Sequence, residues 1–519
     1  DNLRIASHLS LNKGILELFQ KYINPFVLCE LDYKIQNINS LANDLIVAPI
    51  ERASNAMKKF SRLSDSEVVT PGIVTDKLIN AIPDDAINNK TFLIDIAAKQ
   101  GEFVYSVYKK YGRDVANKFY SIPTSNIAYE FTRKVYTLLE LDLSHIEQNY
   151  TSYDLIKEND LIENETIKIN NTSMKFDVIV GNPPYQQKDE GTNKNSASPI
   201  YNKFMDAAKS LSPNYISMIM PTKWYAGGKG LDSFRDEMLN DIHISELHDF
   251  LEPELIFKNI NLRGGICYLL WDKSYDNSKD LTKMCTYKDN LIPTCFCRSL
   301  KTEGSYILIR HNVAVEMLNK ICSHFDFDSF KNYISSRKPF GIEGNITNNE
   351  QIFITPRKNK KNLITCYARG RKICYVDKSL VTENEYLIDK VKVFAPYTNN
   401  IGTELNDDNL NVFIGDVGTI CTETYIVFGI GLSLDIDSAN NMCKYFKSKF
   451  ARFTHSLAKA SHHGTSKTYI FVPNQNFTNY SDIDWSKSIQ EIDKQLYSKY
   501  NLTNEEIEFI ESMIKPMIE

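Results

Sequence analysis

Residues 176–185 have the sequence Phe-Asp-Val-Ile-Val-Gly-Asn-Pro-Pro-Tyr. The apolar run from Phe176 to Val180 predicts a buried strand. Pro183 and Pro184 have a fixed φ angle and no amide hydrogen, so the residues after this strand can join neither a helix nor a sheet ladder. The stretch therefore predicts a strand and then a turn whose backbone carbonyl groups stay available for hydrogen bonds.

This turn has the chemistry of an acceptor site for a planar amine. The side-chain oxygen of Asn182 and the carbonyl of Pro183 can each accept one hydrogen of an NH2 group, while the ring of Tyr185 stacks on the attached π-system. Such bonds draw the lone pair out of conjugation and make the nitrogen a nucleophile. The alternative is an ordinary strand with a proline-stiffened turn. We disfavour it because a buried strand and an asparagine precede the prolines.

Apolar segments alternate with amphipathic segments on both sides of this stretch. The expected strands comprise residues 92–96, 119–122, 176–180, 215–220 and 265–271. The expected helices comprise residues 73–81, 103–111, 128–139 and 201–211. This alternation predicts an α/β fold with a mostly parallel, doubly wound sheet.

The pattern changes twice along the chain, which predicts three domains. Residues 1–65 have helical periodicity and predict an N-terminal helical segment. Residues 66–275 contain the α/β alternation. Residues 276–519 combine short strands, loops rich in Asn and Lys, and a helical end at 489–517, so we expect a separate mixed α+β domain there.

Composition restricts the class of protein. With 519 residues, 42% hydrophobic and 24% charged, the chain can bury a sizeable core. No apolar run approaches the roughly 18 residues that span a bilayer, and the first residues do not resemble a signal peptide. We therefore expect a cytoplasmic protein with no membrane partner. The missing initiator Met suggests either processing or the C-terminal portion of a longer polypeptide.

The cysteines and histidines predict no metal site. The ten cysteines are scattered, and the closest pair, Cys295 and Cys297, has a spacing that suits neither zinc nor a redox dithiol. We expect buried, reduced thiols. A second group contains Cys443, His455, His462 and His463, but its spacing fits no zinc pattern, so a polar loop is the preferred interpretation.

Basic residues gather in two windows although the net charge is -5. Residues 357–378 contain eight Lys or Arg and one acid, and residues 444–467 contain six Lys or Arg and no acid. Basic patches of this kind suit contacts with phosphates. A single charge run is more often just a solvated face, but both windows lie in the same third of the chain, which favours a phosphate contact.

The turn after the first expected strand is a candidate cofactor site. In an open α/β sheet a ligand lies beyond the carboxyl ends of the strands, where this strand places Asp95. Residues 96–103, Ile-Ala-Ala-Lys-Gln-Gly-Glu-Phe, form a tight turn with the single glycine Gly101, which on its own is equally consistent with an ordinary strand-to-helix turn. Upstream, Thr70 and Pro71 lie in a turn that can cross the same pocket.

Together these features resemble the gamma class of S-adenosylmethionine-dependent N6-adenine DNA methyltransferases. In that family a Thr-Pro segment, an Asp-Pro-x-x-Gly-x-Gly-x-Phe loop and an Asn-Pro-Pro-Tyr motif occur in this order before a target-recognition domain. The resemblance covers residues 66–272 closely and the remainder in layout, and residues 181–186 are its specific part. The chain is also similar to the methylase portion of restriction-modification fusion proteins, through residues 224–230, 263–268 and 336–341.

The resemblance implies a Rossmann-like methyltransferase sheet, S-adenosylmethionine as the cofactor, and methyl transfer to N6 of an adenine flipped out of double-stranded DNA. It implies catalytic roles for Asn182, Pro183, Pro184, Tyr185 and Phe257. Tyr185 and Phe257 would cover the two faces of the base, although a lone Phe in an apolar stretch is equally consistent with a core position.

The resemblance implies cofactor contacts from Thr70, Pro71, Asp95, Ala97, Gly101, Phe103, Thr124, Asp154 and Asn182. Two positions depart from the family pattern. Lys99 replaces the first family glycine, and residues 122–125, Ile-Pro-Thr-Ser, lack the acid that usually holds the ribose hydroxyls. Cofactor binding is therefore expected to be weak, to rely on Thr124, or to depend on a partner or DNA.

Sequence recognition would belong to residues 276–519, the target-recognition domain that the resemblance implies. The candidate DNA contacts are Arg337, Lys338, Arg369, Arg371, Lys372, Lys459 and Lys467. The resemblance also implies that a nuclease or helicase region can precede the methylase, in the same polypeptide or as a separate subunit. Two alternatives stay open: a methyltransferase acting on RNA or protein glutamine, and a non-catalytic DNA-binding subunit that kept the fold.

Overall fold

The computed structural model describes most of the chain from Tyr33 to Met517. The residues described are 33, 36–37, 40, 43–57, 68–157, 161–188, 197–257, 265–288, 291–302, 305–344, 351–355, 362–401, 408–459, 462–515 and 517. They form two compact units, which we call unit 1 (residues up to Trp224 and Lys229–Ser299) and unit 2 (Tyr225–Gly228 and Leu300–Glu519). The expected domain boundaries near residues 65 and 275 stay predictions.

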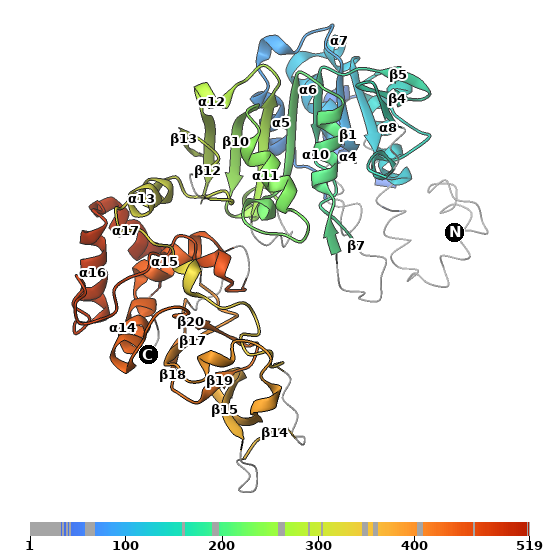
Figure 1. Cartoon of the computed structure of the whole chain (residues 1–519). Helices are drawn as coiled ribbons and strands as arrows, with labels where there is room; N and C mark the ends of the chain where they lie inside the picture. The colour runs from blue at the N-terminus through green and yellow to red at the C-terminus, as the bar shows by residue number, and fades with distance from the viewer. Residues whose placement is uncertain are drawn as a thin grey trace. The chain divides into compact units, whose positions relative to one another are not determined.

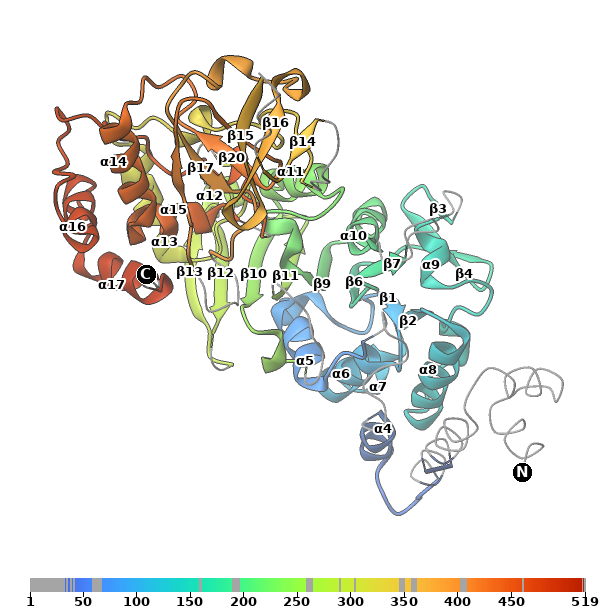
Figure 2. The same ribbon diagram turned by 90° about the horizontal axis from the view of Figure 1, so that it is seen from below.

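Unit 1 is built on an eight-stranded sheet (Figure 1), and its strand order is β13-β12-β10-β11-β9-β6-β1-β2 (Figure 2). Its strands are β1 Leu93–Ala98, β2 Phe119–Pro123, β6 Val178–Gly181, β9 Tyr215–Pro221, β10 Ile244–Phe250, β11 Ile266–Asp272, β12 Thr282–Tyr287 and β13 Thr294–Arg298. Strands β2, β1, β6 and β9 are mutually parallel, whereas β11 is antiparallel to both of its neighbours. The mostly parallel sheet predicted from the sequence is confirmed.

Helices cover both faces of this sheet. Helices α5, α6 and α8 lie on one face, and α10 and α11 lie on the other (Figure 2). The helices of unit 1 are α4 Pro49–Met57, α5 Gly72–Ala81, α6 Glu102–Tyr111, α7 Arg113–Ala116, α8 Asn126–Leu138, α9 Ser152–Leu155, α10 Tyr201–Ser210, α11 Asp232–Asn240 and α12 Asn277–Asp280. Unit 1 also contains two small sheets. One consists of β3 Ile162–Glu163, β4 Thr166–Ile169 and β5 Thr172–Met174, and the other consists of β7 Gln186–Lys188 and β8 Ala197–Pro199. The doubly wound α/β class is confirmed.

Strand β10 was not predicted because polar residues interrupt its apolar pattern. His248 is nevertheless buried, with its ring stacked on Tyr268 at 4.2 Å between centroids. Its Nε2 atom lies 2.8 Å from a carboxylate oxygen of Glu246. Because side chains satisfy each other's polar groups here, a polar segment occupies the interior of the sheet.

The expectation that all cysteines are reduced is wrong for one pair. Cys285 and Cys295 form a disulfide. They lie directly opposite each other in the antiparallel pair β12–β13. Strand register determines this pairing, and register is not visible in cysteine spacing alone. Cys297 is a free thiol but is exposed, so the expectation that the cysteines are buried is also wrong for that residue.

Unit 2 combines two small sheets with helices. Its strands are β14 Ile352–Phe353, β15 Leu363–Ala368, β16 Lys372–Asp377 and β19 Thr419–Cys421 in one sheet, and β17 Lys392–Pro396, β18 Phe413–Gly415 and β20 Tyr425–Phe428 in the other. Its helices are α13 Asn312–Cys322, α14 Ile436–Lys447, α15 Lys449–Leu457, α16 Ile489–Lys499 and α17 Asn504–Met513. The mixed α+β character predicted for this part is confirmed.

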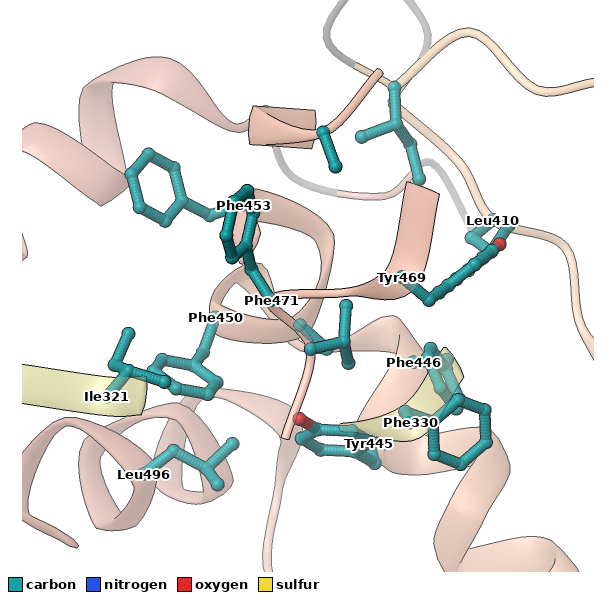
Figure 3. Close-up of a cluster of buried hydrophobic side chains, with 14 of the residues drawn as sticks. Ile321, Phe330, Leu410, Tyr445, Phe446, Phe450, Phe453, Tyr469, Phe471 and Leu496 are labelled. Atoms are coloured by element: carbon teal, nitrogen blue, oxygen red, sulfur yellow. The ribbon is translucent and has the colours of Figure 1, made fainter. Parts of the chain in front are cut away.

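An aromatic core holds unit 2 together. Figure 3 shows side chains from different helices and loops meeting in this core, including Phe330, Phe446 and Tyr469. Phe330 and Phe446 make an edge-to-face contact at 4.8 Å. Such pairs contribute roughly 0.5–1.5 kcal/mol beyond the burial of their area.

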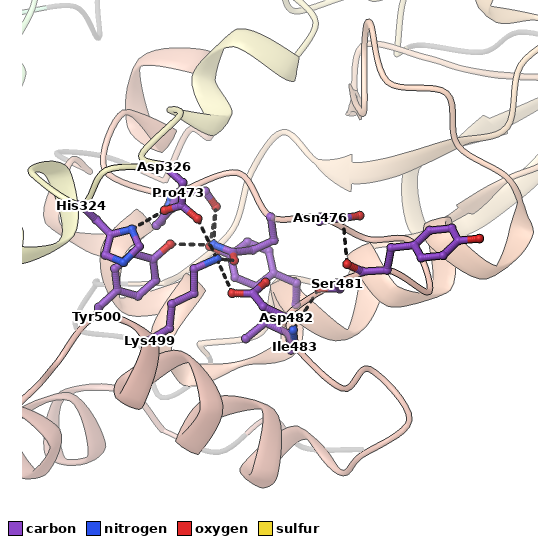
Figure 4. A network of polar contacts seen from close by, with 12 residues as sticks. His324, Asp326, Pro473, Asn476, Ser481, Asp482, Ile483, Lys499 and Tyr500 are labelled. Carbon is purple, nitrogen blue, oxygen red and sulfur yellow. Dashed lines mark hydrogen bonds and ion pairs between the residues drawn. The ribbon is translucent and has the colours of Figure 1, made fainter.

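A network of polar contacts fastens the end of α16 to neighbouring loops (Figure 4). The Lys499 ammonium forms ion pairs with Asp326 at 3.3 Å and Asp482 at 2.9 Å, and it donates to Gln475 at 3.1 Å. The Gln475 amide donates to the Tyr500 hydroxyl at 2.9 Å. Every polar group in this set has a partner, so its role is structural.

Candidate active site

The expected ligand site lies where the strand order reverses. Strand β1 is flanked by β2 on one side and by β6 on the other. Asp95 lies opposite Val180 in the β1–β6 pair, so the loops after these strands leave the same edge of the sheet side by side. This edge is the topological switch point at which open α/β sheets bind ligands.

Asn182 is buried and held in one orientation. Its Nδ2 group donates to the carbonyl of Val68 at 3.2 Å and to the hydroxyl of Thr70 at 3.1 Å. Its Oδ1 atom is buried and has no hydrogen-bond partner in the described part of the chain. The amide is thus anchored through its donor end, and its acceptor end is available for a ligand.

Lys99 links the loop after β1 to the turn after β6. Its ammonium donates to the backbone carbonyl of Asn182, and its side chain is buried. The residue that departs from the family glycine is therefore a direct support of the Asn-Pro-Pro-Tyr turn. This contact could not be predicted from the sequence, because 83 positions separate the two residues.

Glu102 holds the Thr70 segment against the same loop. Its carboxylate accepts from the amide of Gln100 at 2.8 Å and from the amide of Thr70 at 3.2 Å. Gly101 lies between Gln100 and Glu102 in the sequence. Its φ angle of 75° favours glycine, and an added Cβ would lie 3.3 Å from the side chain of Val135. The predicted proximity of the Thr70 turn and the glycine loop agrees with these contacts, whereas the buried Glu102 was not singled out from the sequence.

Burial, and to a smaller extent the neighbouring Glu102 carboxyl, raises the pKa of Asp95 to about 8, although the amide of Ala97 and the ammonium of Lys99 act against this rise. The amide of Ala97 donates to Asp95 Oδ1 at 2.9 Å. At neutral pH this buried carboxyl is therefore largely protonated. A bound cation beside it would favour the ionised form.

In the wild-type protein we expect the ionisation of Asp95 to lower the free energy of unfolding as pH rises. The substitution Asp95→Asn should remove this decrease. In the unfolded chain an aspartate titrates near pH 4, so between roughly pH 4 and 8 the folded state keeps a proton that the unfolded state has released. The free energy of unfolding then falls by up to about 1.4 kcal/mol per pH unit through this group. Urea denaturation at pH 5 and pH 8 measures the effect.

The matched control for this experiment is the exposed aspartate Asp85, changed to Asn. The difference in unfolding free energy between Asp95→Asn and the wild type should grow with pH, and the difference for Asp85→Asn should not. An equal difference at both pH values for Asp95→Asn would contradict the raised pKa.

The other predicted cofactor residues lie in or next to elements of this part of unit 1, and their contact with a cofactor stays a prediction. Ala97 and Phe103 are buried, and Pro71 precedes α5. Thr124 follows β2, and its buried hydroxyl has no hydrogen-bond partner in the described residues. Asp154 lies in α9, which contacts β1, and its carboxylate accepts from the amide and hydroxyl of Thr151, both at 2.8 Å.

Tyr185 and Phe257 both lie in the main hydrophobic core of unit 1. Tyr185 is 9% exposed and Phe257 is 1% exposed. The Tyr185 hydroxyl has no hydrogen-bond partner among the described residues, and burial raises its pKa well above the ordinary value. A base that entered between these rings would have to displace core contacts, and their role as a pair of stacking surfaces stays a prediction.

The predicted DNA contacts are all in unit 2, but in different settings. Arg337, Arg369 and Arg371 line one cavity. Lys338 forms an ion pair with Glu343, and Lys372 is exposed at the start of β16. The Lys467 ammonium lies over the ring of Tyr306 at 5.9 Å.

Lys459 has a different environment from the other candidates. Its ammonium donates to the backbone carbonyl of Asn399 at 2.8 Å and to its side-chain oxygen at 2.5 Å. Burial lowers the pKa of Lys459 to about 7. Its contact with DNA stays a prediction.

Among the described residues, no group of three or more His, Cys, Asp or Glu side chains is arranged to hold a metal ion. His455 lies in helix α15, so the expectation that it belongs to a polar loop is wrong for this residue. Its ring is buried against Tyr469 with 3.9 Å between centroids, and its Nδ1 lies 2.9 Å from the carbonyl of Thr468. None of the helices in the described ranges combines the length and apolar character that crossing a bilayer requires.

Residues 111–257 match the model of the Eco57I restriction-modification methylase family. The match includes β2, the Asn-Pro-Pro-Tyr turn and Phe257, and it confirms the resemblance to restriction-modification methylases. The assignment to the gamma class stays a prediction.

A curated relative and two solved structures are also similar. An uncharacterized adenine-specific methylase of Mycoplasma pneumoniae is 36% identical over 134 residues, which are 25% of this chain and 32% of the relative. The chain thus spans about a third of the length of that relative. A DrdV–DNA complex has a TM-score of 0.48 at 12% identity, covering 91% of this chain and 63% of that chain. The type IIL enzyme MmeI, in complex with DNA, has a TM-score of 0.45 at 12% identity, covering 92% and 77%.

Proposed function

We propose that this protein is an adenine-specific DNA methyltransferase that uses S-adenosylmethionine and transfers the methyl group to N6 of an adenine flipped out of a specific duplex sequence. The observation that supports this proposal most directly is the state of Asn182. Its amide is anchored by Nδ2, and its buried Oδ1 has no partner in the described part of the chain. A buried acceptor left open costs about 1–3 kcal/mol, which a ligand amine would offset.

Three groups of the chain would act on the target base. Asn182 Oδ1 and the Pro183 carbonyl would each accept one hydrogen of the adenine amine, and the prolines keep this turn rigid. Tyr185 would stack on the base. Because the amine is poorly basic while its lone pair is delocalised, alignment by these acceptors contributes more than a general base would.

The residues at the switch point fit the proposed cofactor. S-adenosylmethionine, when bound, supplies a methyl group on an already activated sulfonium. Asp95 and the Gly101 loop would lie against its methionine part, and the open hydroxyl of Thr124 would replace the missing acid at the ribose. The buried carboxyl of Asp95 beside Glu102 suits a ligand that carries positive charge.

The substrate assignment rests on the relatives. The curated relative is described as adenine-specific, and the family is a restriction-modification methylase family. We accordingly place the chain in a restriction-modification system, with double-stranded DNA as partner and a nuclease or helicase region upstream or in another subunit. Unit 2 would be the target-recognition domain.

A methyl-transfer assay tests the proposal. The full chain is incubated with tritiated S-adenosylmethionine and, in separate reactions, unmethylated duplex DNA, RNA and a protein extract. We expect label in duplex DNA only. Label in RNA or in protein glutamine would establish a different substrate class. No label together with no cofactor binding by calorimetry would favour a non-catalytic DNA-binding subunit.

A further inference from the structure

Unit 2 contains a cavity of about 800 Å³ that gathers residues from distant parts of the chain. Its wall includes the turn Arg369–Arg371 between β15 and β16, the segment after β17, and the segment before β20. Three arginines face it, and Glu423 is its only carboxylate among the described residues. The cavity therefore attracts groups that accept hydrogen bonds or carry negative charge.

Arg337 is an accessible cation of this cavity that two neighbouring side chains orient. Its guanidinium forms an ion pair with Glu423 at 2.9 Å and lies over the ring of Tyr397 at 5.1 Å. Tyr397 is itself stacked on His463 with 5.0 Å between centroids. Glu423 is fixed in turn, because its Oε1 accepts from the amide of Gly344 at 3.2 Å. The guanidinium of Arg337 is thus held by two contacts before any ligand arrives.

Although oriented, Arg337 is still accessible. Its side chain is 56% exposed, so edges of the guanidinium that do not face Glu423 can bind a ligand. A guanidinium has five N–H donors, and one carboxylate contact leaves several of them available. The ion pair also compensates its charge, which weakens attraction to a phosphate but leaves hydrogen bonding to a neutral group intact.

Arg369 and Arg371 differ from Arg337. The Arg371 guanidinium lies over Phe413 at 4.6 Å and donates to the Asn411 carbonyl at 3.2 Å, so it forms part of the wall. Arg369 is exposed at the tip of the turn, and no ion pair of Arg369 is found in the described residues. An exposed and uncompensated arginine suits a phosphate, which tolerates many approach directions.

We infer that this cavity receives a guanine nucleotide step of the DNA substrate: Arg337 donates to O6 and N7 of a guanine, and Arg369 contacts a neighbouring phosphate. The inference rests on the proposed function and makes it more specific. It assigns base discrimination to Arg337, and it assigns to Arg369 a contribution to affinity that does not depend on the DNA sequence. A fixed planar fork matches the two acceptors of guanine, whereas a lysine at the same place would not.

The test is selection from a randomised duplex library by the full chain, with wild type, Arg337→Lys and the matched control Arg369→Lys. We expect wild type to select a motif with an invariant G·C pair. Arg337→Lys should lose discrimination at that pair by about 5- to 100-fold and keep the other positions, because it retains charge but not the fork. Arg369→Lys should keep the whole motif. Arg369→Ala should lower the salt-dependence slope of binding by about 0.9.

A second variant, Glu423→Gln, tests the orientation of Arg337 without changing Arg337 itself. Glu423→Gln should reduce the discrimination at the same base pair that Arg337→Lys affects. An unchanged motif in both variants, with uniformly weaker binding, would overturn the base contact and make Arg337 a phosphate contact. Loss of discrimination at the G·C pair in Arg369→Lys, with the pair kept in Arg337→Lys, would also overturn the assignment. A wild-type motif that binds but is never methylated would contradict the proposed function and leave the cavity's role intact.

Discussion

Asn182→Ala is expected to reduce methyl transfer by at least about a hundredfold, the loss typical of removing one preorganised hydrogen-bonding group from an active site. The reason is the buried Oδ1, which has no partner in the described part of the chain and is the proposed acceptor for the adenine amine. Initial rates with tritiated S-adenosylmethionine and unmethylated DNA measure the loss. Calorimetry of cofactor binding should show an affinity within a few-fold of wild type.

The same substitution also removes two buried hydrogen bonds. The Nδ2 group holds the Val68 carbonyl and the Thr70 hydroxyl, so the free energy of unfolding should fall by about 1–3 kcal/mol. Thr70→Val is the matched control, since it removes one anchor but keeps the Asn182 acceptor. We expect it to lower the rate only several-fold. A rate for Asn182→Ala within tenfold of wild type, in folded protein, would remove Asn182 from the chemistry.

Lys99→Met is expected to lower kcat by about tenfold or more and to destabilise the fold by about 3 kcal/mol. The variant removes the donor to the Asn182 carbonyl, and it removes the cation that opposes the rise in the pKa of the buried Asp95 carboxyl. Breaking a buried charge arrangement by removing one partner typically costs several kcal/mol. Kinetics at saturating cofactor, together with urea denaturation, measure both effects.

The control for Lys99 is an exposed lysine on the adjoining helix. Lys109 in α6 is 49% exposed at its side chain and pairs with Asp76, an arrangement that contributes at most about 1 kcal/mol. Lys109→Met should therefore resemble wild type in both assays. If Lys99→Met behaved like Lys109→Met, Lys99 would not position the turn. Asp95 should also titrate at a higher pH in Lys99→Met, because Lys99 opposes the rise in its pKa.

The sheet could be predicted where strands are mostly apolar. Strands β1 and β6 are buried throughout, and β9 is buried from Ile216 onward, so their composition identified them. Strand β10 could not be identified in this way. Its His248 is accommodated by stacking on Tyr268 and by Glu246, which are tertiary contacts that local pattern does not contain.

The sequence allowed the segments of the candidate site to be proposed, but it did not predict the contacts between them. The Asn-Pro-Pro-Tyr turn and Asp95 were identified because their chemistry is local, and the sheet brings them to the same edge. The contact of Lys99 with Asn182 depends on the pairing of β1 with β6. The cavity of unit 2 was even harder to predict from the sequence, since Arg337, Tyr397 and Glu423 lie far apart along the chain.

The measurement that tests the central claim most directly is the identity of the methylated atom. The full chain is incubated with S-adenosylmethionine and genomic DNA that lacks methylation, and the digested nucleosides are identified by mass spectrometry. We predict N6-methyladenine at one short, defined sequence, formed at least about a hundredfold more slowly by Asn182→Ala. N4-methylcytosine would contradict the assignment of adenine, because cytosine also presents an exocyclic amine. The absence of any methylated nucleoside, from protein that binds the cofactor, would contradict the proposal that DNA is the methyl acceptor.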